Sequence, residues 1–200
     1  MIQCDQDSDL WVVTINRPEK AGALTRDMLH DLADIAEAAT SCKALILTGT
    51  GTVFSAGADL DAVRAGLATD PAWERLSSAV AAVPGFTIAA LNGTVAGGAF
   101  GMTLACDLRI AVPEAQFFYP VMRLGFLPPP SDPGRLRTLV GPSRAKMILM
   151  AGQRINAQEA CDWGLVDRLV AGDVVAAARG LAAQTMDATL PHSSTIKRMI

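Results

Sequence analysis

The chain has 200 residues and a formal net charge of −3, with 50% hydrophobic and 18% charged residues. This composition is typical of a globular domain with a sizeable core and excludes an intrinsically disordered chain. Because the balance is acidic and the Lys and Arg residues are scattered, no basic face is available, and we expect no nucleic-acid partner.

The sequence also argues against a membrane protein and a metal site. The uncharged stretch between Arg75 and Asp107 is interrupted at Pro84-Gly85 and Asn92-Gly93, whereas a spanning helix needs about 20 uninterrupted apolar residues. The four cysteines lack metal-ligand spacing and follow no signal peptide, and the two histidines are isolated. We therefore expect free thiols in a reducing cytoplasm, no metal and no membrane association.

The first half of the chain alternates between predicted strands and helices. Runs rich in β-branched and other apolar residues predict strands at 10–15, 44–48 and 86–91. Apolar residues at helical spacing, with Thr25 as one N-cap, predict helices at 25–39, at 59–67, from Pro71 at its first position to a point before Pro84, and at about 98–106.

The second half continues this pattern with more helices. We expect a strand at 108–112, an extended run at 116–119 and a last strand at 166–170, with helices at about 134–140, 143–151, 156–163 and 173–186 and the beginning of another near Pro191. The proline-rich segment 128–133 is predicted to be a stiff loop without regular helix or strand. Repeated strand–turn–helix units favour an α/β fold with mainly parallel strands.

Two of the predicted strands lead into glycine-rich turns. Ala56-Gly57-Ala58 follows the strand at 44–48, and Ala96-Gly97-Gly98 follows the strand at 86–91. Glycine permits close approach of a ligand, and a turn that enters a helix leaves backbone N–H groups unpaired. Two such turns facing each other would bind a developing oxyanion without a charged side chain.

These turns resemble those of the crotonase (enoyl-CoA hydratase/isomerase) superfamily. The resemblance rests on Phe54-Ser-Ala-Gly-Ala-Asp-Leu60 and Asn92-Gly-Thr-Val-Ala-Gly-Gly98, and three further stretches agree in order and spacing: Ile15–Lys20, Ala105–Arg109 and Glu159–Val166. It implies a crotonase-like spiral of ββα units with a C-terminal helical region that builds trimers. We expect a core domain at 1–187, the start of a truncated helical tail at 188–200, and a homotrimer or a dimer of trimers.

The resemblance also implies site residues. The backbone N–H groups of Ala58 and Gly98 would form an oxyanion hole for the carbonyl oxygen of a coenzyme A thioester. Coenzyme A would be part of the substrate, with no permanently bound cofactor. Its binding residues would be Lys20, Ala21, Ala23, Ala56, Asp59, Leu60 and Gly97, with Gly22 at a position where relatives usually have asparagine.

The acid–base residues of the family pattern are missing from this sequence. Hydratases carry glutamates at the positions of Gly101 and Val121, and some isomerases and dehalogenases carry an aspartate at the position of Pro129. None of these three residues moves a proton. Because a positioned acid or base contributes about 10²–10⁴-fold to the rate, we do not expect the standard hydratase mechanism.

Other residues are candidate replacements for the glutamates. Asp132 in the proline-rich segment and Tyr119 just before Val121 are candidate proton donors, with Asp61 and Arg123 as further options. Three of these residues also have a purely structural interpretation. Asp132 would be a turn residue before proline, Tyr119 a core residue, and Asp61 an acid in the first turn of a helix.

Three functional hypotheses remain. The first is an acyl-CoA thioester enzyme of fatty acid metabolism, a lyase or isomerase that stabilises a thioester enolate. The second is a non-catalytic acyl-CoA-binding protein that keeps the two turns only to hold the thioester. The third is a subunit that is active only within a mixed oligomer.

Overall fold

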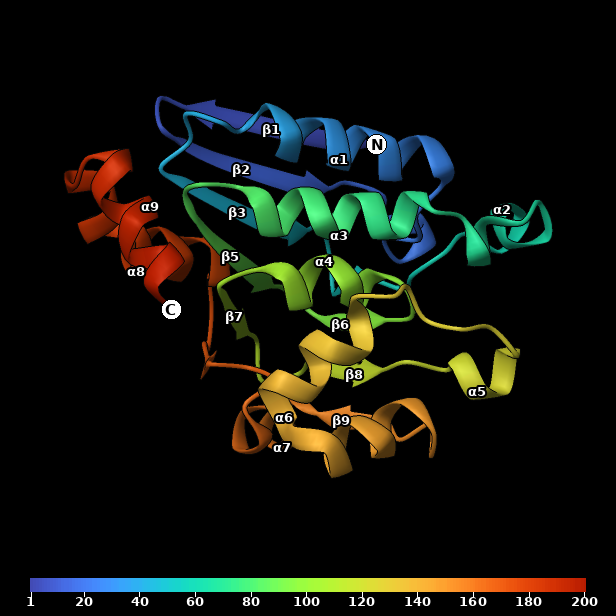
Figure 1. Cartoon of the computed structure of the whole chain (residues 1–200). Coiled ribbons are helices and arrows are strands. Elements are labelled where there is room, and N and C mark those ends of the chain that lie inside the picture. The colour runs from blue at the N-terminus through green and yellow to red at the C-terminus, as the bar shows by residue number, and fades with distance from the viewer.

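The computed structural model describes residues 1–200, and two β-sheets organise the chain (Figure 1). The larger sheet has the order β1-β2-β3-β5-β7-β10 and consists of β1 (Ile2–Asp7), β2 (Leu10–Ile15), β3 (Ala44–Gly49), β5 (Phe86–Leu91), β7 (Leu108–Ala111) and β10 (Arg168–Leu169). All of its neighbours pair in parallel except β1 and β2. The α/β class predicted from the sequence is confirmed.

The smaller sheet has the order β4-β6-β8-β9 and is built from β4 (Val53–Ser55), β6 (Thr94–Ala96), β8 (Gln116–Phe118) and β9 (Ile155–Asn156). The pairs β4–β6 and β6–β8 are parallel, and β8–β9 is antiparallel. After each of the long strands β3, β5 and β7, the chain therefore runs into one short strand of the second sheet.

Nine α-helices and two 3₁₀ helices complete the fold. They are η1 (Pro18–Lys20), α1 (Arg26–Ala38), α2 (Leu60–Arg64), η2 (Leu67–Thr69), α3 (Ala72–Ala82), α4 (Ala99–Ala105), α5 (Val121–Leu124), α6 (Asp132–Leu149), α7 (Ala157–Trp163), α8 (Val174–Asp187) and α9 (Leu190–Met199). None of these helices is long and apolar enough to cross a bilayer.

Helices cover both faces of the larger sheet, which explains why its central strands are mostly apolar. In β3, Leu45 and Leu47 pack into the main core with α1, α3 and α4, whereas Ala44 and Ile46 pack on the opposite face against α8 (Figure 1). Successive side chains of a strand point to opposite faces, so a strand buried on both sides has few polar positions.

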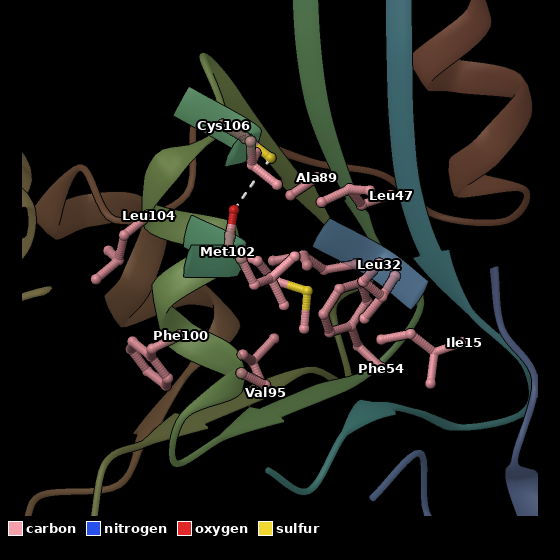
Figure 2. Packing of buried hydrophobic residues seen from close by; sticks show 14 of the residues in the cluster. Ile15, Leu32, Leu47, Phe54, Ala89, Val95, Phe100, Met102, Leu104 and Cys106 are labelled. Atoms are coloured by element: carbon pink, nitrogen blue, oxygen red, sulfur yellow. Dashed lines mark hydrogen bonds between the residues drawn. The ribbon is translucent and has the colours of Figure 1, made fainter. Parts of the chain in front are cut away.

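The main core continues from the sheet to the short strands and α4. Figure 2 shows Leu47, Phe54, Val95 and Met102 gathered there, and the Cys106 thiol donates a 3.3 Å hydrogen bond to the Met102 carbonyl. Because Phe54 and Val95 are fully buried, the short strands that lead to the two glycine-rich turns are anchored in this core.

Most of the predicted elements are confirmed, with differences at their ends. Thr25 caps α1 as expected, since its hydroxyl accepts a 3.3 Å hydrogen bond from the Met28 N–H. The two helices predicted at 134–140 and 143–151 correspond to the two parts of α6, which is kinked at Gly141, where the φ of 79° and ψ of 166° are not helical. The division into 1–187 and 188–200 stays a prediction.

The prediction of a stiff loop at 128–133 is wrong at the C-terminal end of this segment. Asp132 and Pro133 lie in the first turn of α6. Proline is tolerated there because the N–H group it lacks would have no partner within the helix. This correction matters for the site, because Asp132 sits on a helix and not on a free loop.

Candidate functional site

The two glycine-rich turns meet because β4 and β6 are parallel neighbours. Ser55 pairs with Val95, so the segments 56–58 and 96–98 leave the same edge of the smaller sheet. A β-carbon placed on Gly57 would lie only 2.8 Å from the Ala96 carbonyl oxygen and 3.4 Å from the Gly97 Cα. The two backbones are therefore in direct contact, which the missing side chain and the φ of +88° at Gly57 permit.

Each turn presents one unpaired backbone N–H group. On either side of Ala58, the Gly57 carbonyl accepts from Leu24 N–H at 2.7 Å, and Asp59 N–H donates to the Leu24 carbonyl at 2.9 Å. The N–H groups of Ala58 and Gly98 donate to no acceptor of the protein, and both residues line one pocket. The sequence prediction that these turns lie together with free donors is thus consistent with the geometry.

This pocket has a volume of about 290 Å³ and mostly hydrophobic walls. Its lining residues come from both turns and from α2, α3, β8 and α5: Ala56, Ala58, Leu60, Val63, Ala68, Trp73, Gly97, Gly98, Phe118, Tyr119, Pro120, Val121, Arg123, Leu124, Phe126, Leu127 and Pro129. No Asp, Glu or His is among them. The only ionisable side chains in the lining are Tyr119 and Arg123.

The loop at residues 20–23, before α1, is hydrogen-bonded to the first glycine-rich turn and to the strand that leads into it. Ala56 N–H donates to the Ala21 carbonyl at 2.9 Å, and Ser55 Oγ donates to the Gly22 carbonyl at 2.8 Å. The predicted coenzyme A-binding residues of the segments 20–23 and 56–60 are thereby brought together. Whether they bind coenzyme A is a proposal taken up below.

Asp59 has a structural role within this group. Its Oδ1 accepts from the N–H groups of Asp61 and Ala62 at the start of α2, and its Oδ2 lies 2.9 Å from Arg17 Nη1. The hydrogen bond from Ala62, and after it the Arg17 guanidinium, hold the pKa of the Asp59 carboxyl below its ordinary value. By contrast, Lys20 is exposed and forms no hydrogen bond or ion pair through its side chain, and Leu60 is 76% exposed at the rim of the pocket.

The two candidate proton donors form a buried pair. Tyr119 Oη donates a 2.8 Å hydrogen bond to Asp132 Oδ2, and the residues are 3% and 1% exposed. The second oxygen, Asp132 Oδ1, is buried without a partner. Tyr119 is among the residues that line the pocket and Asp132 is not, so Tyr119 is the member of the pair that contacts the pocket.

The surroundings of this pair favour its protonated forms. Burial raises the pKa of Asp132 to about 6, against the hydrogen bond from Tyr119 and the charge of Arg135. Burial and the neighbouring Asp132 raise the pKa of the Tyr119 phenol above its ordinary value. A carboxyl that titrates near neutral pH is suited to exchanging protons, because both of its forms are populated there.

The three positions at which the resemblance predicted carboxylates in relatives lie around the pair and the pocket. Gly101 is in α4, and a β-carbon there would be 2.9 Å from Asp132 Oδ1. Val121 and Pro129 line the pocket. Asp61, in contrast, is exposed, lies 2.8 Å from Arg64 and is not among the lining residues, so the structure does not bring it to the site.

Two residues of α3 contribute to the site and were predicted only as parts of a helix. The Trp73 indole packs on Gly98, where an added β-carbon would be 2.8 Å from the ring, and its Nε1 donates to the Leu67 carbonyl at 2.8 Å. The Glu74 carboxylate accepts from the Ser131 N–H at 3.1 Å and from the Ser131 hydroxyl, next to Asp132. Helical spacing revealed the burial of Trp73, but no sequence signal pointed to these partners.

Comparison with known proteins identifies similar chains of one family. A family model described as enoyl-CoA hydratase/isomerase matches residues 5–200. The Bacillus subtilis protein YngF is 38% identical over 189 residues, which cover 89% of this chain and 72% of that protein. A crotonyl-CoA hydratase from Syntrophomonas wolfei is 36% identical over 176 residues, covering 83% and 67%.

Solved structures share the same fold. DspI of Pseudomonas aeruginosa matches with a TM-score of 0.90 at 32% identity, covering 98% of this chain and 84% of that one. An enoyl-CoA hydratase from Bacillus anthracis matches with a TM-score of 0.89 at 31% identity, covering 98% and 81%.

Proposed function

Because the chain belongs to the enoyl-CoA hydratase/isomerase (crotonase) family, we propose that it is an enzyme that forms and protonates the enolate of an acyl-CoA thioester. The observation that carries this proposal is the pair of unpaired N–H groups, on Ala58 and Gly98, which line one pocket from two adjoining turns. Coenzyme A enters as part of the substrate, and no permanently bound cofactor is proposed.

The two N–H groups suit an enolate better than a thioester. When C2 of an acyl thioester loses a proton or carbon dioxide and keeps the bonding electron pair, negative charge moves onto the carbonyl oxygen, and donors already fixed in place bind that oxygen more strongly than the neutral carbonyl. Losing one such donor typically costs about 2.7–4 kcal/mol of transition-state stabilisation. The apolar walls, which include Trp73 and Phe126, strengthen this effect because they exclude water.

Tyr119 and Asp132 are proposed to carry the proton. In the direction of enolate formation, Tyr119 Oη takes a proton from C2 while its own proton passes to the ionised Asp132 carboxyl, and the C2–H electron pair delocalises onto the thioester oxygen. In the reverse direction, the Tyr119 proton goes to C2 and the proton of the carboxylic acid at Asp132 replaces it. Charge and protons balance in both directions, and Tyr119 stays a neutral phenol before and after.

This scheme favours isomerisation, decarboxylation or another lyase step over hydration. Hydration of an enoyl thioester also needs a base that activates water, and no Asp, Glu or His lines the pocket. The same feature favours the alternative function, a non-catalytic acyl-CoA-binding protein. The two functions differ in one measurable property, which is the exchange of the C2 hydrogens with solvent.

Coenzyme A is proposed to bind at the loop of residues 20–23 and at the first glycine-rich turn. Main-chain atoms at Ala21, Ala23 and Ala56 would hold the adenine, and Lys20 would pair with a phosphate as a point charge. The homotrimer or dimer of trimers and the cytoplasmic location predicted from the sequence stay predictions.

The proposal is tested by deuterium exchange in heavy water, with saturated, enoyl and malonyl-type CoA thioesters analysed by mass spectrometry. The informative comparison is Gly98→Pro against Gly98→Ala. Both variants place a β-carbon against Trp73, and the φ of −60° at Gly98 suits proline, but only proline removes the N–H group.

We expect deuterium uptake or a change of substrate mass with the wild type. Gly98→Pro should be slower than Gly98→Ala by about 10²–10³-fold. Tight binding of the same thioesters without exchange would support the binding protein instead. Equal rates in the two variants would contradict the role of the Gly98 N–H group.

A further inference from the structure

A second cavity, which the proposed proton transfer does not use, adjoins the pocket. It has a volume of about 190 Å³ and is lined by Phe118, Pro120, Arg123, Gly152 and Arg154. The first three of these residues also line the pocket beside Ala58 and Gly98. The cavity therefore lies next to the pocket, at β8 and α5.

Two arginines give this cavity its charge. Arg123 and Arg154 belong to none of the ion pairs in the structure, and no acidic side chain lines the cavity. In a chain with a net charge of −3, two positive side chains without a carboxylate partner in one cavity form a local site for an anion.

One of the arginines is already held in position. The Arg154 guanidinium carbon lies 4.0 Å from the centroid of the Phe118 ring, and its Nη1 donates to Gln116 Oε1 at 3.1 Å. Stacking on a ring leaves the remaining N–H groups at the edge of the guanidinium plane free to bind a carboxylate. Phe118 lines both the pocket and the cavity, and the Arg154 guanidinium stacks on its ring.

The cavity shares no lining residue with the proposed coenzyme A site. On the pocket itself, Ala56 and Leu60 belong to the first turn and α2, whereas Arg123 belongs to α5, a separate helix in Figure 1. An acyl group that leaves the coenzyme A site and has its thioester carbonyl at Ala58 and Gly98 would extend towards Arg123, which lines the same pocket.

We infer that Arg123 and Arg154 bind a carboxylate at the distal end of the acyl group, so that the substrates are CoA thioesters of dicarboxylic acids. This inference rests on the proposed function, since it needs an acyl-CoA in the pocket. Arginine suits the role because its planar guanidinium forms paired hydrogen bonds with a carboxylate. A hydrogen bond to a charged group typically changes affinity by about 10- to 100-fold.

The test compares matched thioesters by isothermal titration calorimetry. Succinyl-, glutaryl- and adipoyl-CoA are titrated against butanoyl-, pentanoyl- and hexanoyl-CoA of equal carbon number, and free coenzyme A serves as a probe of phosphate binding. The proteins are the wild type, Arg123→Gln and Arg154→Gln. Arg144→Gln is the control, because Arg144 also stacks on an aromatic ring, that of Trp163 at 5.5 Å, but lines neither the pocket nor the cavity.

We expect the wild type to bind one dicarboxylic thioester about 10- to 100-fold more tightly than its monocarboxylic partner. This preference should disappear in Arg123→Gln and Arg154→Gln and persist in Arg144→Gln. If Arg123→Gln and Arg154→Gln both keep the preference for the dicarboxylic thioester, the inference is overturned.

The remaining outcomes separate this inference from the proposed function. If monocarboxylic thioesters bind and no dicarboxylic thioester is preferred, the distal carboxylate is wrong and the acyl-CoA function stands. If both variants weaken free coenzyme A and every thioester equally, the arginines bind phosphate and the inference is again overturned. If the wild type binds no CoA thioester at all, both proposals are wrong.

Discussion

The carboxylate of Asp132 occupies the space beside Gly101, where a β-carbon would lie 2.9 Å from Oδ1 and 3.3 Å from Oδ2. The two residues belong to different helices, α6 and α4. Because Gly101 has no side chain, a carboxylate reaches from α6 to a position beside α4 and accepts the Tyr119 hydroxyl there. Position 101 is one at which the resemblance predicted a hydratase glutamate, and Asp132 places a carboxylate beside that position from another helix.

The first prediction concerns the proton-carrying pair. Asn at position 132 cannot accept the proton that Tyr119 passes on, and Phe at position 119 has no hydroxyl, so Asp132→Asn and Tyr119→Phe should each slow deuterium exchange at C2 by about 10²–10⁴-fold. Exchange is measured by mass spectrometry at saturating thioester, and near-ultraviolet circular dichroism checks that each variant is folded.

Asp61→Asn is the matched control for the aspartate change. Asp61 is exposed on α2, pairs with Arg64 and does not line the pocket, so its exchange rate should equal that of the wild type. Wild-type rates in both Asp132→Asn and Tyr119→Phe would show that the pair is only structural.

The second prediction is the pH dependence of exchange. In the proposed mechanism, enolate formation requires the ionised Asp132 carboxyl, whose pKa is raised by burial to about 6. Below that pH the carboxyl is protonated and cannot take the Tyr119 proton, so the exchange rate should fall about tenfold per pH unit; above it the rate should level off. The profile is recorded between acidic and neutral pH, and a rate that stays flat through this range would argue against Asp132.

The fold class and the candidate backbone donors could be predicted from the sequence because the patterns that indicate them are local. The apolar run Ala44–Thr48, bounded by a glycine turn, and the pair of glycine-rich segments are visible without tertiary information. The short strands β4, β6 and β9 were not predicted, because segments of two or three residues are too short to show an alternating pattern. The pairing of β4 with β6 nevertheless brings the two turns side by side.

The partners of the site residues depend on contacts between distant segments. The sequence suggested Tyr119 and Asp132 separately as proton donors. Their hydrogen bond depends on α6 beginning at Asp132. That helix start was not predicted, because the surrounding segment is rich in proline. Likewise, nothing in the spacing of α3 predicts that Trp73 packs on Gly98. Such pairings are set by the packing of α3, α4 and α6, and not by periodicity within any one helix.

The third prediction links Asp132 to stability. Its carboxyl has a pKa of about 6 in the folded protein, against 3.8 as the ordinary value. The folded state therefore binds the proton more tightly than the unfolded state. This contribution to stability is complete below pH 3.8 and is lost as the pH rises through 6.

Asp132→Asn does not titrate, so it isolates this effect. Relative to the variant, the wild type should lose about 3 kcal/mol of unfolding free energy as the pH rises through this window, by the conversion of a pKa shift into free energy. Urea unfolding of both proteins at several pH values between acidic and slightly alkaline measures the difference. A difference that does not vary with pH would contradict a raised pKa for Asp132.

The fourth prediction separates backbone strain from the contact between the two turns. Gly57 and Gly66 have nearly the same φ, +88° and +90°, but an added β-carbon at Gly57 meets the Ala96 carbonyl oxygen at 2.8 Å, whereas nothing lies within 4 Å of one at Gly66. Alanine at either position carries the same backbone strain, of about 1–3 kcal/mol. Gly57→Ala should cost a further ~1–3 kcal/mol by overpacking.

The extra cost at Gly57 should also appear in function, because an alanine there pushes apart the turns that hold the Ala58 and Gly98 N–H groups. Gly66→Ala, measured by urea unfolding and by deuterium exchange, should be destabilised and yet exchange at the wild-type rate when folded. Gly57→Ala should lose both stability and exchange, since donors moved off their positions bind the enolate oxygen less well. If the two variants behaved alike, strain alone would explain both, and the direct contact of the two turns would have no role in catalysis.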